Sequence, residues 1–312
     1  MPELEIQPFS DDHLEPAAEL LAERHQHHRE AEPLLPELSD PLAAVEADWR
    51  ADDASGAFAS RGGEPVGYLI AAPTPVVADI SWMRVWIAGQ AMRGDCEAMR
   101  DLYAAAAQRW VDEGHTRHAV FAPSHDAELV DAWFRLSFGG SAIFAIRETG
   151  PEDRFDGGVT IRPGTPDDFP DTARLEIAMS EAMVPAPSFS GIVTQSHDEV
   201  LEEWREDGDS DDYELFIAER DGRTVGHTVL YHRPPDLRVP EGSIDLAQVS
   251  TEPEARGTGV GRAMTAHVLG WAHEHGYAVM TTDWRMTNLF ASRFWPKRGF
   301  RPTFLRLYRS IP

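Results

Sequence analysis

One loop concentrates the residues that could bind a charged ligand. It follows a predicted strand, Ile244 to Thr251, precedes a predicted helix, Ala263 to His275, and reads Arg256-Gly257-Thr258-Gly259-Val260-Gly261-Arg262. Glycines let a backbone approach a phosphate closely, and the first N–H groups of a helix have no partner within it. The helix dipole adds to the attraction of an anion. The order strand, glycine-rich turn, helix therefore predicts a site for a ligand that carries a pyrophosphate.

The spacing of the glycines narrows the choice of ligand. Glycines at 257, 259 and 261 form neither a Walker loop, which ends in Gly-Lys-Ser/Thr, nor a dinucleotide fingerprint. The pattern Arg-x-x-Gly-x-Gly after Pro253-Glu254 is followed by Asn288, Ala291, Phe294-Trp295 and Gly299-Phe300. Together these segments resemble the GCN5-related N-acetyltransferases (GNAT), over roughly residues 159 to 312.

The resemblance implies an acyl-CoA site. Acetyl-CoA would be the co-substrate. The backbone of the strand before the loop would bind the acyl carbonyl, the loop would bind the pyrophosphate, and Asn288 would contact the pantetheine arm. The residues assigned to cofactor binding are Val249, Ser250, Thr251, Arg256, Gly257, Thr258, Gly259, Val260, Gly261, Arg262, Asn288 and Ser292.

Transfer of the acyl group to an amine also needs proton transfers. The ammonium form must lose a proton before it can attack, and the leaving thiolate benefits from a proton donor. Trp295 stands where the family has a tyrosine, and indole cannot donate a proton near neutral pH. Ser292, one turn after Asn288, is the candidate donor, unless the thiolate leaves unaided. Asp245 and Asp283, together with Glu214, are candidates either for the base or for binding a cationic amine.

The charges of the chain favour a specific anion. The chain has 53 Asp and Glu against 28 Lys and Arg. Residues 256 to 309, however, contain only two acidic residues, Glu274 and Asp283. The cations in the same range are Arg256, Arg262, Arg285, Arg293, Lys297, Arg298, Arg301, Arg306 and Arg309. A local basic patch suits the phosphates of coenzyme A, whereas the acidic remainder would repel nucleic acid. A cationic face that is merely solvated is the alternative.

The chain also contains two repeats that would position these residues. The residues around Trp49 resemble those around Trp204, and Trp133 and Phe138 correspond to Trp295 and Phe300. Each repeat begins with a strand and a capped helix, at Ser10 and at Thr165, and goes on through a second helix, a hairpin, a long helix and further strands. The expected fold is α/β: two tandem GNAT-like domains, each a mixed central sheet flanked by helices, at residues 1–150 and 151–312. The linker is predicted at Glu148 to Gly158.

The first repeat is predicted to have lost its cofactor loop. An offset of 161 residues places Cys96, Ala98 and Arg100 where the second repeat has its glycines, and no partner of Asn288 is evident. Such a degenerate half would stabilise the second half or shape its substrate cleft.

Composition bounds the remaining possibilities. A single cysteine excludes an intramolecular disulfide and a cysteine metal cluster, and no metal site is predicted at His25, His27 and His28. The sequence shows neither a signal peptide nor an apolar run long enough to span a membrane, so a cytoplasmic protein is expected. The oligomeric state stays open.

The sequence thus predicts an N-acyltransferase. It would move an acetyl or short acyl group from acetyl-CoA to a primary amine of a small molecule or peptide. A non-catalytic acyl-CoA-binding regulatory protein is the alternative, suggested by Trp295, and a nucleotide-binding module is a third possibility.

Overall fold

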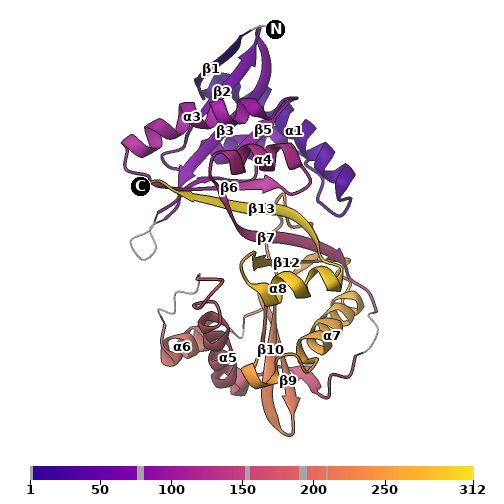
Figure 1. Ribbon diagram of the computed structural model, residues 1–312. Coiled ribbons are helices and arrows are strands. Elements are labelled where there is room, and N and C mark those ends of the chain that lie inside the picture. Colours follow the sequence, from indigo (N-terminus) through magenta and orange to yellow (C-terminus); the bar gives the residue numbers. More distant parts are fainter. Residues whose placement is uncertain (1–2, 76–80, 152–154, 190–194, 209) are drawn as a thin grey trace. The chain divides into compact units, whose positions relative to one another are not determined.

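The computed structural model describes residues 3–75, 81–151, 155–189, 195–208 and 210–312. Its contacts divide the chain into two compact units, one formed by Met1–Phe144 with Pro302–Pro312 and the other by Ala145–Arg301. They are called unit 1 and unit 2 below (Figure 1). Strand β7 (Gly139–Glu148) passes from unit 1 into unit 2.

Unit 1 contains a mixed sheet. Its strands follow the order β1-β2-β3-β4-β6-β13, with β5 paired to β3, and only β4 and β6 are parallel among these pairs. The bounds of its strands are β1 Leu4–Pro8, β2 Ser55–Arg61, β3 Glu64–Pro73, β4 Met83–Val85, β5 Gln90–Met92, β6 Arg117–Pro123 and β13 Arg301–Ser310. The helices are the 3-10 turn η1 Asp11–His13, α1 Leu14–Ala31, α2 Pro41–Trp49, α3 Glu97–Asp112 and α4 Ala127–Arg135.

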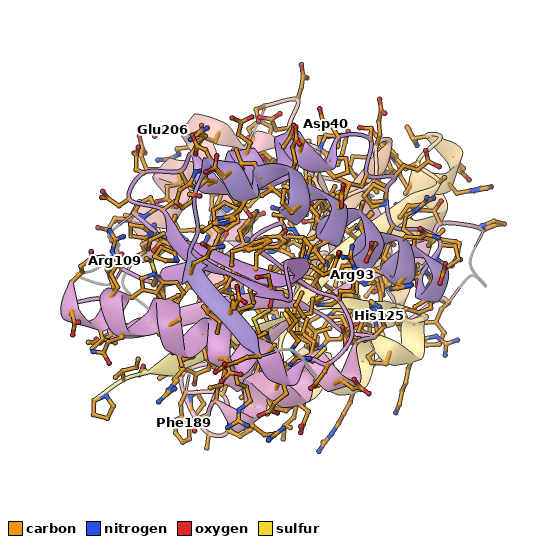
Figure 2. All side chains as sticks on the ribbon, turned by 90° about the horizontal axis from the view of Figure 1, so that it is seen from above. Asp40, Arg93, Arg109, His125, Phe189 and Glu206 are labelled. Atoms are coloured by element: carbon orange, nitrogen blue, oxygen red, sulfur yellow. The ribbon has the colours of Figure 1, made fainter. Side chains whose placement is uncertain are left out.

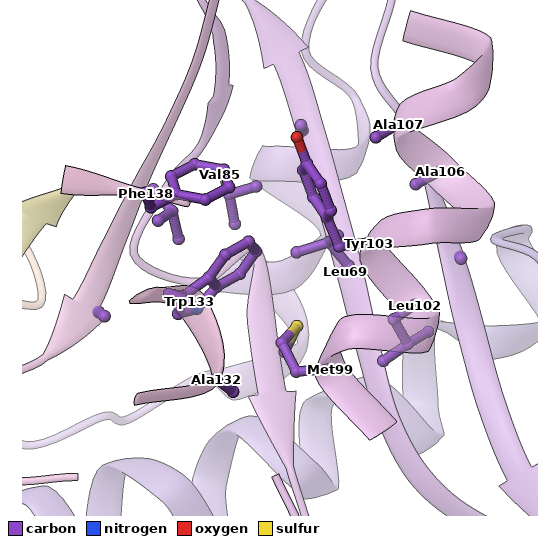
Figure 3. Close-up of a cluster of buried hydrophobic side chains, with 14 of the residues drawn as sticks. Leu69, Val85, Met99, Leu102, Tyr103, Ala106, Ala107, Ala132, Trp133 and Phe138 are labelled. Carbon is purple, nitrogen blue, oxygen red and sulfur yellow. The ribbon is translucent and has the colours of Figure 1, made fainter. Parts of the chain in front are cut away.

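The core of unit 1 joins α3 and α4 to the sheet. Tyr103 of α3 packs edge-to-face on Trp133 of α4 and on Phe138, with ring centroids 5.6 and 5.3 Å apart, respectively (Figure 3). Leu307 of β13 is fully buried in the same cluster. Aromatic side chains at this density give both apolar burial and favourable ring geometry.

The end of the chain completes the sheet of unit 1. Strand β13 lies antiparallel to β6 from Phe304 opposite Pro123 to Ser310 opposite Arg117. Phe304 and Leu307 are completely buried there. The division differs from the predicted one at this point, because residues 302–312 fold with the first half of the chain rather than with the second.

Unit 2 repeats the plan of unit 1. Its strands follow the order β12-β11-β10-β9-β8, and among these neighbouring pairs only β11 and β12 are parallel. The bounds of its strands are β8 Thr160–Pro163, β9 Tyr213–Arg220, β10 Arg223–Tyr231, β11 Ser243–Thr251 and β12 Val279–Arg285. Its helices are η2 Pro166–Asp168, α5 Phe169–Glu181, α6 His197–Asp207, η3 Pro253–Ala255, α7 Val260–Glu274, α8 Leu289–Phe294 and η4 Pro296–Arg298. Helix α5 packs on β10 and β11, and α7 packs on β9, β10 and β11.

Strands β11 and β12 separate part-way along their length. Their parallel register ends at Leu246 opposite Thr282, and a bulge places Ala247 out of register with β10. Beyond the bulge, Gln248–Thr251 continue the pairing with β10. Since successive backbone groups of a strand point to alternate sides, some N–H and C=O groups of this stretch face away from β10. An open strand edge therefore lies directly before the glycine loop.

Candidate acyl-CoA site

The glycine loop has the backbone shape that its sequence demands. Gly257 and Gly259 have φ values of +76° and +99°, which side-chain-bearing residues rarely adopt. Gly259 is the N-cap of α7, so the helix begins at Val260 rather than at the predicted Ala263. Gly261 and Arg262 therefore belong to the first turn of the helix.

The start of α7 is open to an anion. The N–H groups of Val260, Gly261 and Arg262 have no acceptor within the helix, whereas the N–H of Ala263 bonds to the Gly259 carbonyl at 3.0 Å. The first turn contains no acidic residue. At Gly261, a Cβ atom would meet nothing nearer than the Phe294 ring at 3.9 Å. The geometry expected of a phosphate site is therefore present at this helix end.

A basic pocket borders the first turns of α7. It encloses about 300 Å³, and its lining includes the cations Arg147, Arg262, Lys297 and Arg298. The nine cations of the predicted basic patch therefore do not all line this pocket. Arg306 and Arg309 lie on β13 in unit 1, and Arg301 pairs with Glu148 at 2.9 Å.

In the strand residues before the loop, side chain and backbone have different roles. Ser250 is buried, and its hydroxyl donates to the Leu175 carbonyl of α5 at 2.8 Å. Its side chain is therefore committed to packing α5 on the sheet. Val249, Ser250 and Thr251 can contribute backbone groups to an acyl carbonyl, as the sequence predicts, because they lie beyond the point where β11 leaves β12.

A buried histidine, which the sequence does not signal, lies beside this stretch. His227 on β10 is completely buried, and its Nε2 lies 3.2 Å from Oε1 of Gln248. Burial lowers the pKa of His227 to about 4, so the imidazole is neutral near pH 7. An isolated histidine within an apolar strand carries no sequence signal, because only the pairing of β10 with β11 brings Gln248 to it.

Asn288 is the N-cap of α8. Its Oδ1 accepts hydrogen bonds from the backbone N–H groups of Phe290 at 3.1 Å and Ala291 at 3.2 Å. Capping leaves the amide NH2 group as the donor for a pantetheine carbonyl, which is the role that the resemblance implies. Asp126 caps α4 in unit 1 through the N–H of Leu129, so Asn288 does have a counterpart in the first repeat.

Substitutions at Asn288 separate its two roles. Asn288→Ala should destabilise unit 2 by about 1 kcal/mol through the lost cap, and should weaken acetyl-CoA binding about fivefold through the lost donor. Asn288→Asp keeps a capping oxygen, replaces the donor by a charged carboxylate oxygen, and should show the affinity loss without the stability loss. Calorimetry and thermal melting measure the two effects. Wild-type affinity in Asn288→Asp would restrict this residue to capping.

Ser292 and Trp295 are both tied to the protein interior. The Ser292 hydroxyl donates to the Met286 carbonyl at 2.9 Å. Donation of a proton by Ser292 stays a prediction, and it would require this hydrogen bond to break first. Trp295 is buried against Phe300, with ring centroids 5.3 Å apart, as Trp133 is against Phe138 in unit 1. The tryptophan at the family's tyrosine position is therefore a core residue.

The carboxylates proposed as the base differ in their surroundings. Asp245 is buried near the start of β11, where Oδ1 accepts from the Thr281 hydroxyl at 2.6 Å and Oδ2 from Arg233 at 2.9 Å. Asp245 is thus held in an ion pair near one end of its strand, and its role as the base stays a prediction. Oε1 of Glu214 lies 3.5 Å from Nε2 of His232. Asp283 on β12 is exposed, and it stays a candidate.

The ion pair of Asp245 predicts a measurable stability effect. Asp245→Asn leaves the Arg233 guanidinium, whose side chain is 33% exposed, without its carboxylate. We expect the free energy of unfolding to fall by about 2 kcal/mol. This loss is smaller than that for breaking a fully buried ion pair, because water can solvate the Arg233 guanidinium again. Urea unfolding measures this, with Asp198→Asn, at a side chain 98% exposed, as the control. A large fall in kcat at unchanged stability would support Asp245 as the base.

The matching loop of unit 1 supplies its own anion. Cys96 is the N-cap of α3 and Gly94 has φ +80°, so the loops align at an offset of 163 rather than the predicted 161. Asp95 then occupies the position of Thr258, and its Oδ1 accepts from the N–H of Glu97 at 2.8 Å. A carboxylate thus lies at this helix end, where unit 2 leaves its N–H groups open.

Side chains also bridge the strands of unit 1 where unit 2 is open. The Gln90 amide donates to the Phe121 carbonyl at 2.8 Å and accepts from the Trp133 indole at 3.1 Å. Arg24, buried on α1, donates to the carbonyls of Ile87 and Gln90 at 2.7 and 2.5 Å. The Gln90 side chain therefore links β5 to β6, and Arg24 binds the carbonyls at and just before β5.

The acceptor side of unit 2 is described only in part. The loop from Met183 to Thr194 is a candidate for the acceptor pocket, because such pockets in this fold use variable loops, but its residues 190–194 lie outside the described residues. Phe189, labelled in Figure 2, is 78% exposed.

Comparison with known proteins identifies the second unit. Residues 179–300 match the model of the Acetyltransferase (GNAT) family. A GCN5-related N-acetyltransferase from Sphaerobacter thermophilus has a TM-score of 0.58 at 14% identity, over 98% of this chain and 95% of that one. A glucosamine N-acetyltransferase region in a fungal multi-domain β-N-acetylglucosaminidase has a TM-score of 0.57 at 15% identity, over 99% of this chain and 38% of that one. A search of curated proteins found no match.

The chain therefore carries a GNAT domain in its second unit, and the predicted resemblance is confirmed. The solved structures, at these identities, show likeness of fold, and the predicted α/β class with tandem GNAT-like domains is confirmed. The family transfers acyl groups from acyl-CoA. Among the described residues, no helix is long and apolar enough to cross a membrane.

Proposed function

We propose that this protein is an N-acyltransferase that moves an acetyl or short acyl group from acetyl-CoA to a primary amine of a small molecule or peptide. The single observation that carries the proposal is the open start of α7 after Gly259, beside the separated strands β11 and β12. The pyrophosphate would lie at the N–H groups of Val260 to Arg262. The thioester would reach the open edge of β11.

The reaction needs little more than this arrangement. The amine nitrogen forms a bond to the thioester carbon, the carbon–sulfur bond breaks, and the sulfur leaves as a thiolate. Backbone N–H groups on the open edge of β11 would stabilise the negative charge that develops on the carbonyl oxygen. The exposed Asp283 would accept the proton of the amine, and solvent would protonate the thiolate.

A non-catalytic acyl-CoA-binding protein is the second candidate. It is favoured by the commitment of the Ser292 hydroxyl to the Met286 carbonyl and by the burial of Trp295, which leave neither residue poised to donate a proton. The two candidates differ in turnover. Release of free CoA thiol that depends on an added amine, over a panel of small amines and peptides, supports the enzyme. Tight binding of acetyl-CoA with no thiol release across the panel supports the binding protein.

We expect one acetyl-CoA per chain. The unit 1 loop presents Asp95 at the helix end, and Gln90 bridges the neighbouring strands, so a second molecule would meet both a like charge and filled space. Titration calorimetry gives the stoichiometry directly. Two equivalent sites per chain would show that unit 1 is not degenerate.

A further inference from the structure

The segment that leads into β8 packs on the glycine loop of unit 2. The Phe155 ring lies over the Arg262 guanidinium, 4.0 Å from its carbon to the ring centroid. The same ring covers Gly259, where a Cβ atom would come within 2.7 Å of Phe155 Cε1. The sequence predicts only a polar linker here, yet part of that linker rests on the first turn of α7.

Further contacts hold this segment in place. Gly157 lies so close to α7 that a Cβ on it would be 2.8 Å from the Cβ of Ala263. The Arg220 guanidinium of β9 donates to the carbonyls of Gly157 at 2.7 Å and Gly158 at 3.1 Å, and to the Thr258 hydroxyl at 3.2 Å. One arginine therefore binds the segment and the glycine loop together.

Arg262 depends on this segment for its position. It has no carboxylate within ion-pair distance among the described residues, and its side chain is exposed at the edge of the basic pocket. An exposed arginine loses rotamer freedom when it contacts a ligand, which weakens binding. A guanidinium already stacked on an aromatic ring loses less, because its position is fixed in advance.

We propose that Phe155 is a positioning residue of the cofactor site, which holds the Arg262 guanidinium where it contacts a phosphate of bound acetyl-CoA. The proposal rests on the proposed function, since it assigns the ligand of the pocket as acyl-CoA. Phe155 contacts Arg262 and Gly259, and in this proposal it acts on the phosphate only through Arg262. Its contribution to binding must therefore vanish when Arg262 is replaced.

A double-mutant cycle tests this dependence. Phe155→Leu keeps an apolar contact with Gly259 and removes the ring face, and Arg262→Gln removes the charge. For acetyl-CoA in calorimetry, Phe155→Leu should weaken binding roughly two- to fivefold, the size expected of an exposed cation–π contact. In the Arg262→Gln background the same change should have no effect. Phe155→Tyr should keep wild-type affinity, because tyrosine retains the ring face.

Each outcome decides the proposal. Phe134→Leu, at a ring 46% exposed on α4 of unit 1, is the matched control and should leave binding unchanged. Equal losses from Phe155→Leu in both backgrounds would mean that Phe155 only packs on the loop. Tighter binding in Phe155→Leu would mean that the ring obstructs the site. Either result overturns the positioning role and leaves the proposed function standing, whereas wild-type protein that does not bind acetyl-CoA overturns both.

Discussion

Replacement of Gly261 by aspartate is expected to abolish acetyl-CoA binding and to leave the fold intact. A side chain fits at Gly261, because the nearest atoms to a Cβ there are 3.9 Å away, and an aspartate in the first turn suits the helix dipole. Its carboxylate, however, would occupy the place of the pyrophosphate and repel it. We expect a loss in affinity of at least roughly 100-fold, from the steric block and the like charge together. Unit 1 already has a carboxylate at the matching helix end, that of Asp95.

The control for this variant lies in the same helix. Gly270→Asp adds the same charge to α7 at a position where a Cβ would meet nothing within 4 Å. It should leave acetyl-CoA affinity unchanged, so that a difference between the two variants reports on position rather than on net charge. Gly259→Asp is less informative, since φ +99° and the Phe155 ring would disturb the loop itself. Full affinity in a folded Gly261→Asp protein would refute the assignment of the loop.

Deletion of residues 302–312 is expected to unfold unit 1, although these residues are the last in the sequence. The deletion removes the partner of β6 over seven residue pairs and exposes the space filled by Phe304 and Leu307. The single substitution Phe304→Ala should lower the free energy of unfolding by about 3 to 5 kcal/mol, the usual effect of truncating a buried phenylalanine. Tyr308→Ala, at a side chain 44% exposed on the same strand, should lower it by less than about 1 kcal/mol.

Hydrogen exchange locates the effect of the deletion. The amides of β6 should lose protection in the shortened chain, because their antiparallel partner is gone. If β6 stays protected and Phe304→Ala unfolds at the wild-type urea concentration, the assignment of residues 302–312 to unit 1 is wrong.

The sequence alone determined the features that depend on neighbouring residues. Ser10 and Thr165 begin capping boxes, Asp40 caps α2 ahead of Pro41, and Ser196 caps α6, as their spacing predicts. The glycine loop is equally local, because its positive φ angles and the free N–H groups after it follow from residue types in one short segment. These are the signals that a single sequence carries most directly.

The tertiary structure decided which distant groups meet. Strand β13 pairs with β6, which is more than 170 residues away in the sequence, at Arg309 opposite His118 for example. Asp245 meets Thr281 because β11 lies beside β12, and it meets Arg233 because β11 also pairs with β10. Phe155 reaches Arg262 only because its segment folds back on α7. Strand pairing and charge pairing depend on the closure of long loops, which residue types and spacing do not specify. The sequence therefore determined the glycine loop, and the fold decided which carboxylate forms a buried ion pair and which aromatic ring packs on the loop.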